Sequence, residues 1–352
     1  MKMDENTEKK DLRSIEYRDL TDLILEMGEK KFRAVQIYDW LHKKQADSFD
    51  EMKNVPAALK ERLSEEYAIY PVTINRVQES ALDGTKKYLF ELHDGNLIES
   101  VFMVYEHGNS VCISTQVGCR MGCRFCASTI DGMVRNLTAG EMLAQVYGIM
   151  KETGKRISNV VTMGSGEPLD NYDEVLKFLR MLTGEEGANI SGRNVTVSTC
   201  GLVPKIYKLA DEELTITLAI SLHAGSDEKR RELMPIANRY SLAELMDACR
   251  YYFDKTGRRL TFEYSLVRGV NDTSSDVDSL VGLLKGLNCH INLIPVNPVR
   301  ERSYIQSTKQ ALLSFKNKLE KNHINVTIRR EMGRDIDGAC GQLRRRVISE
   351  SY

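Results

Sequence analysis

The sequence predicts an α/β protein whose main unit is a parallel sheet with helices between its strands. From residue 111 onward, apolar and β-branched runs alternate with helical patterns. The strand-like runs span residues 111–116, 159–163, 194–199, 214–221, 260–266 and 290–295. Six alternations predict a sheet that is either doubly wound or a partial barrel, and a full eight-unit barrel needs more chain than remains. In both architectures a ligand binds at the carboxyl ends of the strands.

Residues 1–70 are predicted to form a small helical domain. Apolar residues at helical spacing run from Leu20 to Met27, a second helix is expected from Phe32 to His42, and Pro56 opens a third. Basic residues surround the second helix: Lys30, Lys31, Arg33, Lys43 and Lys44. Such residues most often form the solvated face of a bundle, and the alternative is a platform for the RNA backbone.

Residues 71–110 are predicted to be a β-rich extension that connects the helical domain to the α/β unit. Three apolar runs between Val72 and Val104 are separated by Asp-Gly pairs at residues 83–84 and 94–95. An Asp-Gly pair between apolar runs is a strong turn signal.

The α/β unit itself is assigned to residues 111–300, and residues 301–352 are expected to add a helix, a strand and a loop. Two helices in this unit have marked starts. Thr138 is followed three residues later by Glu141, and Ser241 by Glu244, and both pairs are typical of capping boxes. A stripe of apolar residues with a 3.6-residue period follows the first pair: Met142, Leu143, Val146, Ile149 and Met150.

Composition excludes several classes of protein. The 352 residues contain 49 Lys and Arg against 50 Asp and Glu, so bulk charge cannot hold a polyanion, and any nucleic-acid binding must use local patches. No stretch has the ~18 apolar residues of a membrane helix, and the charged stretch from Met1 to Arg13 is not a secretion signal. We therefore expect a cytoplasmic protein, where eight cysteines indicate metal or redox chemistry rather than a disulfide framework.

The most specific motif is a cluster of three cysteines, Cys119, Cys123 and Cys126, spaced C-x3-C-x2-C. It follows the first strand of the α/β unit, where a ligand is expected. A closed structural zinc site needs a fourth Cys or His, and none follows at the usual spacing. Three thiolates on a four-iron cluster would leave one iron open to a substrate ligand.

This motif, with an aromatic residue before its last cysteine, resembles that of the radical S-adenosylmethionine (SAM) enzymes. The resemblance implies a partial (β/α)6 barrel and a 4Fe–4S cluster held by Cys119, Cys123 and Cys126. It also implies that SAM chelates the open iron and is cleaved there to a 5′-deoxyadenosyl radical. The protein's part is then to position and shield that radical.

Other polar residues after the predicted strands fit a SAM site. The segment Met163-Gly-Ser-Gly-Glu-Pro168 resembles the glycine-rich SAM-binding turn of that family, although Ser165 replaces a glycine found in many members. Gly166 would let the backbone approach the ligand, and Glu167 could take the SAM ammonium. The remaining candidates for SAM contacts are Ser198, Ser221, Leu222, His223 and Asn297. Without the family resemblance, the segment is equally well an ordinary tight turn and His223 an ordinary polar cap.

Two further cysteines bring the resemblance closer. Cys340 lies in a glycine-rich loop near the C-terminus, and Cys112 lies on the strand that leads to the cluster. Together with the motifs above and the Asp-Ile-Asp-x-Ala-Cys-Gly-Gln-Leu tail, the chain resembles the bacterial dual-specificity RNA adenine-C2 methyltransferases over nearly its whole length. The resemblance implies that Cys340 carries a methyl group, that Cys112 resolves a covalent RNA adduct by forming a disulfide with it, and that Glu99 accepts a proton. On strand periodicity alone, Glu99 is simply an outward-facing residue.

The same resemblance implies the partners. Substrates would be adenosine 2503 of 23S ribosomal RNA and adenosine 37 of some tRNAs, with two SAM molecules used per turnover. A flavodoxin- or ferredoxin-type protein would donate electrons, no membrane is involved, and a monomer suffices. Further candidates for RNA contacts are Arg120, Arg124, Arg344, Arg345 and Arg346.

Two alternatives stay open at this stage. One is the sister family that methylates C8 of the same ribosomal adenosine and confers antibiotic resistance. The other is a metal-stabilised RNA-binding module without catalysis, which would leave the glycine-rich turn and Cys340 without a purpose.

Overall fold

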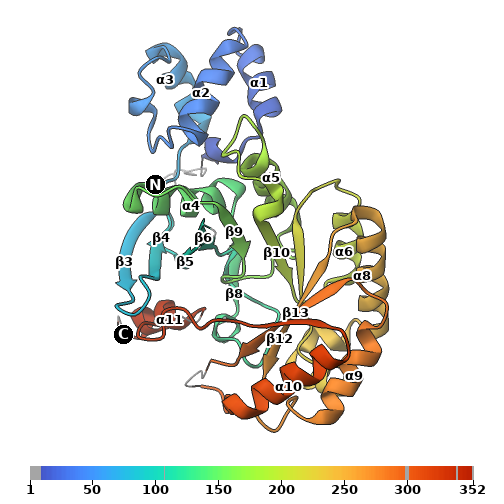
Figure 1. The fold of residues 1–352 in the computed structure, drawn as a ribbon. Helices are drawn as coiled ribbons and strands as arrows, with labels where there is room; N and C mark the ends of the chain where they lie inside the picture. The colour runs from blue at the N-terminus through green and yellow to red at the C-terminus, as the bar shows by residue number, and fades with distance from the viewer. Residues whose placement is uncertain (1–8, 107, 298–300, 338–339, 351–352) are drawn as a thin grey trace, which may run out of the picture.

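The computed structural model describes residues 9–106, 108–297, 301–337 and 340–350 (Figure 1). Part of the charged N-terminal stretch and the predicted boundary at residue 300 therefore lie outside the described residues. Among the described residues, ten strands form one sheet. In spatial order they are β14 (Asn325–Ile328), β13 (Cys289–Pro295), β12 (Leu260–Leu266), β11 (Thr217–Ser221), β10 (Val195–Thr199), β9 (Asn159–Thr162), β6 (Gly108–Cys112), β5 (Leu97–Tyr105), β4 (Lys86–Glu91) and β3 (Thr73–Glu79).

The order of the strands distinguishes the two architectures left open by periodicity. From β6 to β14 each strand pairs in parallel with the next one along the sheet, without the reversal of a doubly wound fold. The helices between these strands form an outer layer, which follows the sheet from the top of the barrel in Figure 1 around its right side to the bottom. The fold is the expected partial (β/α)6 barrel, extended by β14 as a seventh parallel strand.

Helices connect these strands, and the predicted capping boxes are present. The side chains of Thr138 and Ser241 each accept a hydrogen bond from the backbone N–H of the glutamate three residues later. The side chain of that glutamate in turn accepts a hydrogen bond from the backbone N–H of the Thr or Ser. Gly154 and Gly257 end the same two helices in the left-handed conformation. The helices are α4 (Ala139–Thr153), α5 (Tyr172–Thr183), α6 (Val203–Ala210), α7 (Asp227–Leu233), α8 (Leu242–Thr256), α9 (Ser274–Leu284) and α10 (Lys309–Lys321).

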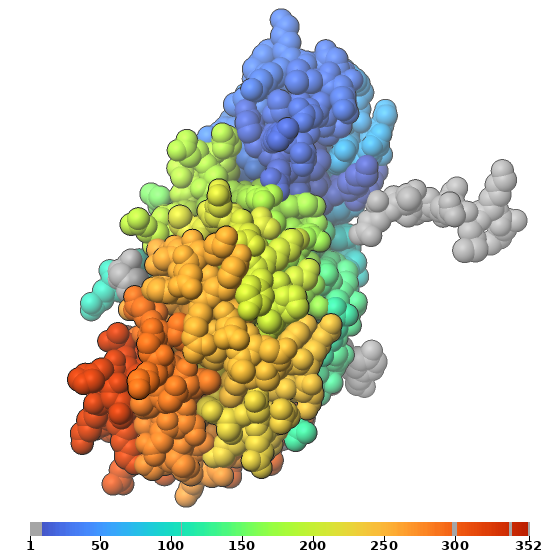
Figure 2. Space-filling view, turned by 90° about the vertical axis from the view of Figure 1, so that its right-hand side faces the viewer, coloured from blue at the N-terminus to red at the C-terminus, as the bar shows by residue number. Residues whose placement is uncertain are grey.

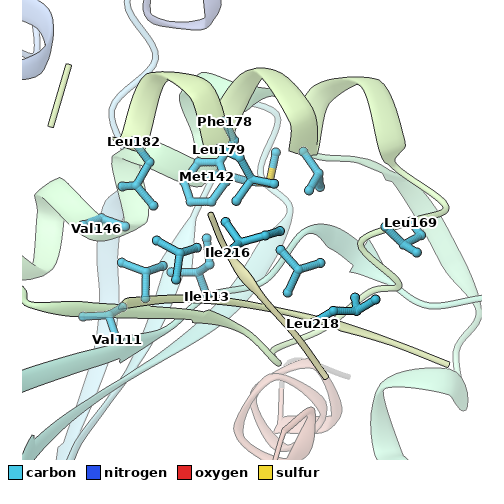
Figure 3. Close-up of a cluster of buried hydrophobic side chains, with 14 of the residues drawn as sticks. Val111, Ile113, Met142, Val146, Leu169, Phe178, Leu179, Leu182, Ile216 and Leu218 are labelled. Atoms are coloured by element: carbon cyan, nitrogen blue, oxygen red, sulfur yellow. The ribbon is translucent and has the colours of Figure 1, made fainter. Parts of the chain in front are cut away.

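The core lies between these helices and the sheet. Figure 3 shows Met142 and Val146 of α4 beside Phe178, Leu179 and Leu182 of α5, above residues of the strands. All five side chains are at most 1% exposed. The predicted stripe on α4 is thus confirmed as a buried face, and only Met150 at its end is partly exposed. A continuous core of this kind fixes the strand ends that carry the site.

The N-terminal residues form the predicted three-helix lobe at one end of the molecule (Figure 2, blue). Its helices are α1 (Tyr17–Glu26), α2 (Phe32–His42) and α3 (Ala57–Glu66), and the short strands β1 (Lys10–Asp11) and β2 (Tyr67–Ala68) pair beside them. The lobe packs closely on the start of α4. The Gly140 N–H donates to Ser14 Oγ at 2.7 Å, and a Cβ at Gly140 would lie 2.0 Å from Asp11 Oδ2. A larger residue there would displace the Asp11 and Ser14 side chains from the start of α4.

The segment predicted as a β-rich connector is part of the main sheet. β3, β4 and β5 form an antiparallel meander, and β5 pairs with β6, the first strand of the barrel. The C-terminal helix α11 (Gln342–Glu350) lies against β5 (Figure 1). The extension therefore supports the C-terminal segment as well as linking two domains.

A small hairpin, β7 (Gln116–Gly118) with β8 (Met133–Asn136), frames the cysteine loop. Short 3-10 helices complete the described elements: η1 (Leu12–Ser14), η2 (Phe49–Glu51), η3 (Ala127–Thr129), η4 (Gly192–Asn194) and η5 (Pro235–Asn238). Within the described ranges, no helix is long and apolar enough to cross a membrane.

Candidate active site at the carboxyl ends of the strands

Two cavities meet at the carboxyl ends of the parallel strands. The first, here called the cluster cavity, has a volume of about 200 Å³ and is lined by Cys119, Cys123, Cys126 and Glu167 among others. The second, here called the outer cavity, has a volume of about 520 Å³ and is lined by Cys112, Tyr105 and Arg330 among others. Cys340 and Arg329 line both cavities. A group on Cys340 can therefore face either space.

The cysteine loop is fixed by its own backbone. Gly118 has a φ of +78°, and a Cβ there would lie 2.1 Å from the Gly132 carbonyl oxygen, so the β7–β8 hairpin closes only with glycine. The Thr129 hydroxyl lies 3.0 Å from the carbonyl oxygens of both Cys123 and Cys126. All three cysteines of the loop line the cluster cavity.

The three thiols fit an iron–sulfur cluster better than a single ion. Among the described residues, no three His, Cys, Asp or Glu side chains converge on one metal position. A cluster does not require such convergence, because each thiolate binds a different iron. Burial raises the pKa of Cys119 to about 12 and that of Cys123 well above its usual value, and the neighbouring thiolates raise both further. A cationic centre would be needed to hold them as thiolates.

The glycine-rich turn after β9 follows the expected pattern with one difference. Gly166 has a φ of +108°, but the chain that it lets approach is the protein's own, since a Cβ would lie 2.7 Å from the Gln116 backbone nitrogen. Glu167 is buried on the cavity wall, and its two carboxylate oxygens accept hydrogen bonds from Leu169 N at 3.0 Å and Cys200 N at 2.7 Å. Burial raises the pKa of Glu167. The carboxylate is thus held rigidly, facing the space in which a SAM ammonium is expected.

The remaining predicted SAM contacts divide into two groups. Ser198, Ser221 and His223 line the cluster cavity, as expected for strand-end residues. Leu222 does not, because its side chain is fully buried in the hydrophobic core between two cavity-facing neighbours. Asn297 lies two residues beyond the end of β13, where the chain has left the rim, and it lines the outer cavity.

His223 is a neutral hydrogen-bonding group. Its φ is 56°, unusual for a residue other than glycine, and its Nδ1 accepts a hydrogen bond from Ser265 N at 2.8 Å. The proton therefore sits on Nε2, and burial together with the charge of Arg230 lowers the pKa of His223 to about 3. Sequence reasoning missed Arg230, a fully buried residue that donates to the Cys200 carbonyl at 2.7 Å and supports this rim from behind. Nothing in its charged surroundings on α7 indicated burial.

Cys112 and Cys340 are brought together from opposite ends of the barrel segment. The Cys112 thiol hydrogen-bonds to Cys340, and this bond lowers the pKa of Cys340 and raises that of Cys112. The charges of Lys87 and Arg329 lower the pKa of Cys340 further. Cys340 Sγ also lies 3.2 Å from the Met163 carbonyl oxygen, at the start of the glycine-rich turn. The pair thus joins an activated thiol to a protonated one.

Glu99 holds the loop that carries Cys340. Its Oε2 lies 3.0 Å from Lys87 Nζ and accepts from Gly341 N at 2.5 Å, while Oε1 accepts from Arg344 N at 2.7 Å. The Glu99 and Lys87 side chains are buried, with 3% and 0% exposure. The carboxylate therefore caps the amino end of α11, beside the thiol pair. Sequence reasoning missed Lys87, whose only signal was a second lysine in an otherwise apolar strand.

The β3–β4 hairpin holds the rest of the C-terminal segment. Asp335 accepts hydrogen bonds from Ser80 Oγ at 2.5 Å and from Ala81 N at 2.8 Å. Asp83 accepts from Gly333 N at 2.9 Å, and Lys87 Nζ donates to the Asp337 carbonyl at 2.6 Å. The antiparallel extension thus holds the loop that carries Cys340 in place.

Replacing Gly341 by alanine is expected to displace the loop that carries Cys340. Gly341 has a φ of +81°, and a Cβ would lie 2.8 Å from the Ser128 backbone nitrogen, just after the cysteine loop. The added methyl would push Cys340 away from the cluster cavity at a strain cost on the order of 1–3 kcal/mol. We expect at least a tenfold slower SAM-dependent methylation of Cys340, followed by mass spectrometry. Gly286→Ala, also at positive φ but with no neighbour within 4 Å, is the matched control for backbone strain alone. Equal rates in both variants would contradict the close approach.

The basic residues that were predicted to contact RNA differ in their exposure and in the ion pairs that they already make. Lys30 and Lys31 are exposed, whereas Lys43 and Lys44 both pair with Asp39. Arg33 donates to Gln36 Oε1 and the Asn54 carbonyl, and Arg124 is exposed. Arg120, beside the cysteine cluster, pairs with Asp170. After Cys340, Arg344 is buried and the next two arginines are paired: Arg345 with Asp131 and Glu301, and Arg346 with Asp337. The arginines after Cys340 thus stabilise the C-terminal segment rather than present a free basic surface.

The chain matches two family models. Residues 113–281 match the Radical SAM superfamily, and residues 10–69 match the ribosomal RNA large subunit methyltransferase N-terminal domain. The first match contains the cysteine loop and the glycine-rich turn, and the second corresponds to the three-helix lobe.

Curated relatives and a solved structure cover almost the whole chain. A probable dual-specificity RNA methyltransferase RlmN from Lachnospira eligens is 62% identical over 340 residues, which is 97% of each chain. One of the same description from Clostridium botulinum is 58% identical, over 94% of this chain and 95% of the relative. The crystal structure of a radical SAM methyltransferase from Sphaerobacter thermophilus matches with a TM-score of 0.89 and 42% identity, over 94% of this chain and 98% of that one.

Proposed function

The chain belongs to the RlmN family of radical SAM RNA methyltransferases, and from this premise we propose that it methylates C2 of adenosine, at position 2503 of 23S ribosomal RNA and position 37 of a subset of tRNAs. The observation that carries the proposal is the hydrogen-bonded pair of Cys112 and Cys340 between two cavities. Ordinary methyl transfer needs no such pair. Methyl transfer through a carrier thiol needs a second thiol beside it, which releases the product from the carrier.

The substrate carbon explains why a carrier is needed. Adenine C2 is an electron-poor amidine carbon and cannot attack the methyl group of SAM as a nucleophile. A route through a carbon attached to the protein avoids that attack. The thiol must first be a good nucleophile itself, and the lowered pKa of Cys340 meets this requirement.

Cys340 therefore takes a methyl cation equivalent from one SAM, losing its proton and leaving S-adenosylhomocysteine. The S-methyl group on Cys340 then faces the cluster cavity, where Cys119, Cys123 and Cys126 would hold the 4Fe–4S cluster and Glu167 the ammonium of a second SAM. When bound, the cluster and SAM supply a 5′-deoxyadenosyl radical that removes one hydrogen atom from the methyl group. Neutral His223, with Ser198 and Ser221, would orient the nucleoside part of SAM on the same wall.

The carbon on Cys340 then bonds to C2, and RNA is linked to the protein. The adduct is at first a radical, so one electron must leave it together with the C2 proton. The electron would return to the cluster that supplied it for the cleavage of SAM. The proton leaves to a base, for which Glu99 is our candidate because it lies beside the loop and is buried with Lys87. Cys112 then attacks Cys340 Sγ and forms a disulfide. The carbon leaves with the electron pair of the S–C bond and is protonated to a methyl group. The disulfide must be reduced before the next turnover.

The setting follows from this chemistry. Reduction of the cluster calls for an electron donor of the flavodoxin or ferredoxin type, and reduction of the Cys112–Cys340 disulfide calls for a reducing compartment, the cytoplasm. All proposed groups come from one chain, so a monomer suffices.

Product identification tests the proposal directly. The protein is reconstituted with iron and sulfide without oxygen, then incubated with SAM, a reductant and a ribosomal RNA fragment. Digested RNA is compared with 2-methyl- and 8-methyladenosine standards by mass spectrometry. We expect 2-methyladenosine. Finding 8-methyladenosine would assign the chain the chemistry of the C8-directed sister family, and a zinc-containing, iron-free protein would indicate the non-catalytic module.

A further inference from the structure

Arg230 is a buried cation that the proposed chemistry does not use. It lies on α7, and its side chain is fully buried, with 0% exposure. Arginine is rarely buried to this extent unless a carboxylate pairs with it, because an unpaired charge in the interior is costly. In the part of the chain that the structure describes, no carboxylate forms an ion pair or a hydrogen bond with its guanidinium. This indicates that the counter-charge is a bound group.

Backbone carbonyls hold the guanidinium in place. Its Nε donates to the Leu222 carbonyl at 3.3 Å, and its Nη2 donates to the carbonyls of Cys200 at 2.7 Å and Ser221 at 3.3 Å. Nη1 is buried and has no hydrogen-bond partner among the described residues. Neutral carbonyls orient the group without removing its charge. The structure thus fixes a whole positive charge behind the carboxyl ends of β10 and β11.

This charge lies beside the loop that carries the cluster cysteines. In that loop, the Arg124 N–H donates to the carbonyl of Leu233, at the end of α7, at 2.9 Å. Cys123 shares one cluster of buried side chains with Cys200 and Leu233. The charge of Arg230 accordingly opposes the rise in the pKa of Cys123 that burial causes. Arg230 is not among the described residues that line the cluster cavity or the outer cavity, so it acts on the site by its charge and not by touching a ligand.

The charge of the expected cofactor is opposite to that of Arg230. A 4Fe–4S cluster on three thiolates is a negatively charged centre, and reduction makes it more negative, so a neighbouring cation favours the reduced state. In the interior of a protein little water screens this attraction. Glu167 accepts a hydrogen bond from the Cys200 N–H and would offset part of the positive charge. A SAM ammonium bound to Glu167 would remove that offset.

We infer that Arg230 is the buried counter-charge of the iron–sulfur cluster and raises the potential at which the cluster accepts its electron. The inference rests on the part of the proposed function that places a cluster on Cys119, Cys123 and Cys126, and it is independent of the RNA. Arg230 tunes the cluster through charge and is not itself a catalytic residue. Its consequence is a larger fraction of reduced cluster with a given electron donor.

The reduction potential tests this inference directly. Anaerobically reconstituted protein is poised at a series of potentials without SAM or RNA, and the reduced cluster is quantified by electron paramagnetic resonance. Arg230→Gln removes the charge and keeps hydrogen-bond donors for the carbonyls, whereas Arg230→Lys keeps the charge. At a given potential we expect an about tenfold lower ratio of reduced to oxidised cluster in R230Q, which is a midpoint about 59 mV lower. R230K should stay close to the unsubstituted protein, as should the matched control Arg231→Gln, which removes the exposed charge next to it on α7.

A second pair of variants leaves Arg230 in place. Cys249 on α8 is fully buried and close enough to Arg230 for that charge to oppose the rise in the pKa of the thiol that burial causes. Cys249→Asp would place a carboxylate beside the guanidinium and neutralise it, and Cys249→Asn has the same shape without the charge. C249D should lower the reduced fraction as R230Q does, and C249N should not. If R230Q alone loses its iron, this pair decides, and equal potentials in C249D and C249N overturn the inference.

The outcomes separate this inference from the proposed function. An unchanged potential in R230Q with full iron and sulfide content would overturn the inference and leave the proposed function standing. Loss of iron from both R230Q and R230K would also overturn it, because Arg230 would then act through its hydrogen bonds and not its charge. Unsubstituted protein that binds no iron–sulfur cluster would overturn both.

Discussion

Cys112→Ala protein is expected to stop after one turnover with RNA covalently attached to Cys340. Cys112 is the only thiol hydrogen-bonded to Cys340 among the described residues, so its removal leaves no group to attack the sulfur of the adduct. Steps before the adduct depend on Cys340 and the cluster cavity, which the substitution leaves in place. Denaturing electrophoresis of labelled RNA should show a protein-bound band that ribonuclease shortens, and free methylated RNA should fall by at least a hundredfold.

Controls separate the chemistry from the loss of a buried side chain. Cys340→Ala, and the double variant with Cys112→Ala, should give neither adduct nor product, because the carrier is missing. Cys249→Ala removes another fully buried thiol, in the core of α8, and should methylate normally. Free product from Cys112→Ala at the normal rate would contradict the resolving role. A labelled band in Cys340→Ala would place the linkage on another residue.

Much of this site was predictable because it depends on local sequence. The C-x3-C-x2-C spacing, the glycine-rich turn after a strand and the serines at strand ends each need only short-range patterns, and the structure gathers them on one cavity. Alternation of side chains also explains the burial of Leu222, which lies between Ser221 and His223 and faces the core. Capping boxes on α4 and α8 were predictable for the same local reason.

The rest depends on contacts between distant segments. The buried pair of Lys87 and Glu99 holds the C-terminal segment only when residues 341–344 fold back on β4 and β5. Arg230 resembles its exposed neighbours on α7 until the barrel buries it. Long-range pairing of this kind leaves no periodic signal in one sequence.

The buried pair of Lys87 and Glu99 gives the second large effect. Lys87→Met would leave Glu99 as an uncompensated buried charge, which typically costs about 3–5 kcal/mol of stability. It would also remove a positive charge that lowers the pKa of Cys340 and a donor to the Asp337 carbonyl. We expect a lower melting temperature, a Cys340 alkylation rate whose pH midpoint shifts upward, and at least a hundredfold slower methylation. Lys86→Met, whose side chain is partly exposed and pairs with Glu152, is the matched control and should change none of these.

A double variant distinguishes the two uses of Glu99. In Lys87→Met with Glu99→Gln no buried charge remains, so most of the lost stability should return, because replacing both partners of a buried pair is far less costly than removing one. Glutamine can still accept from Gly341 N or Arg344 N, so part of the loop anchor survives. It cannot accept the C2 proton. If Glu99 is the base, the double variant regains its melting temperature and accumulates the RNA adduct without product. If Glu99 is only an anchor, the double variant forms free methylated RNA without accumulating adduct, at a rate still limited by the lost Lys87 charge and Asp337 contact, and the base must be sought elsewhere in the outer cavity.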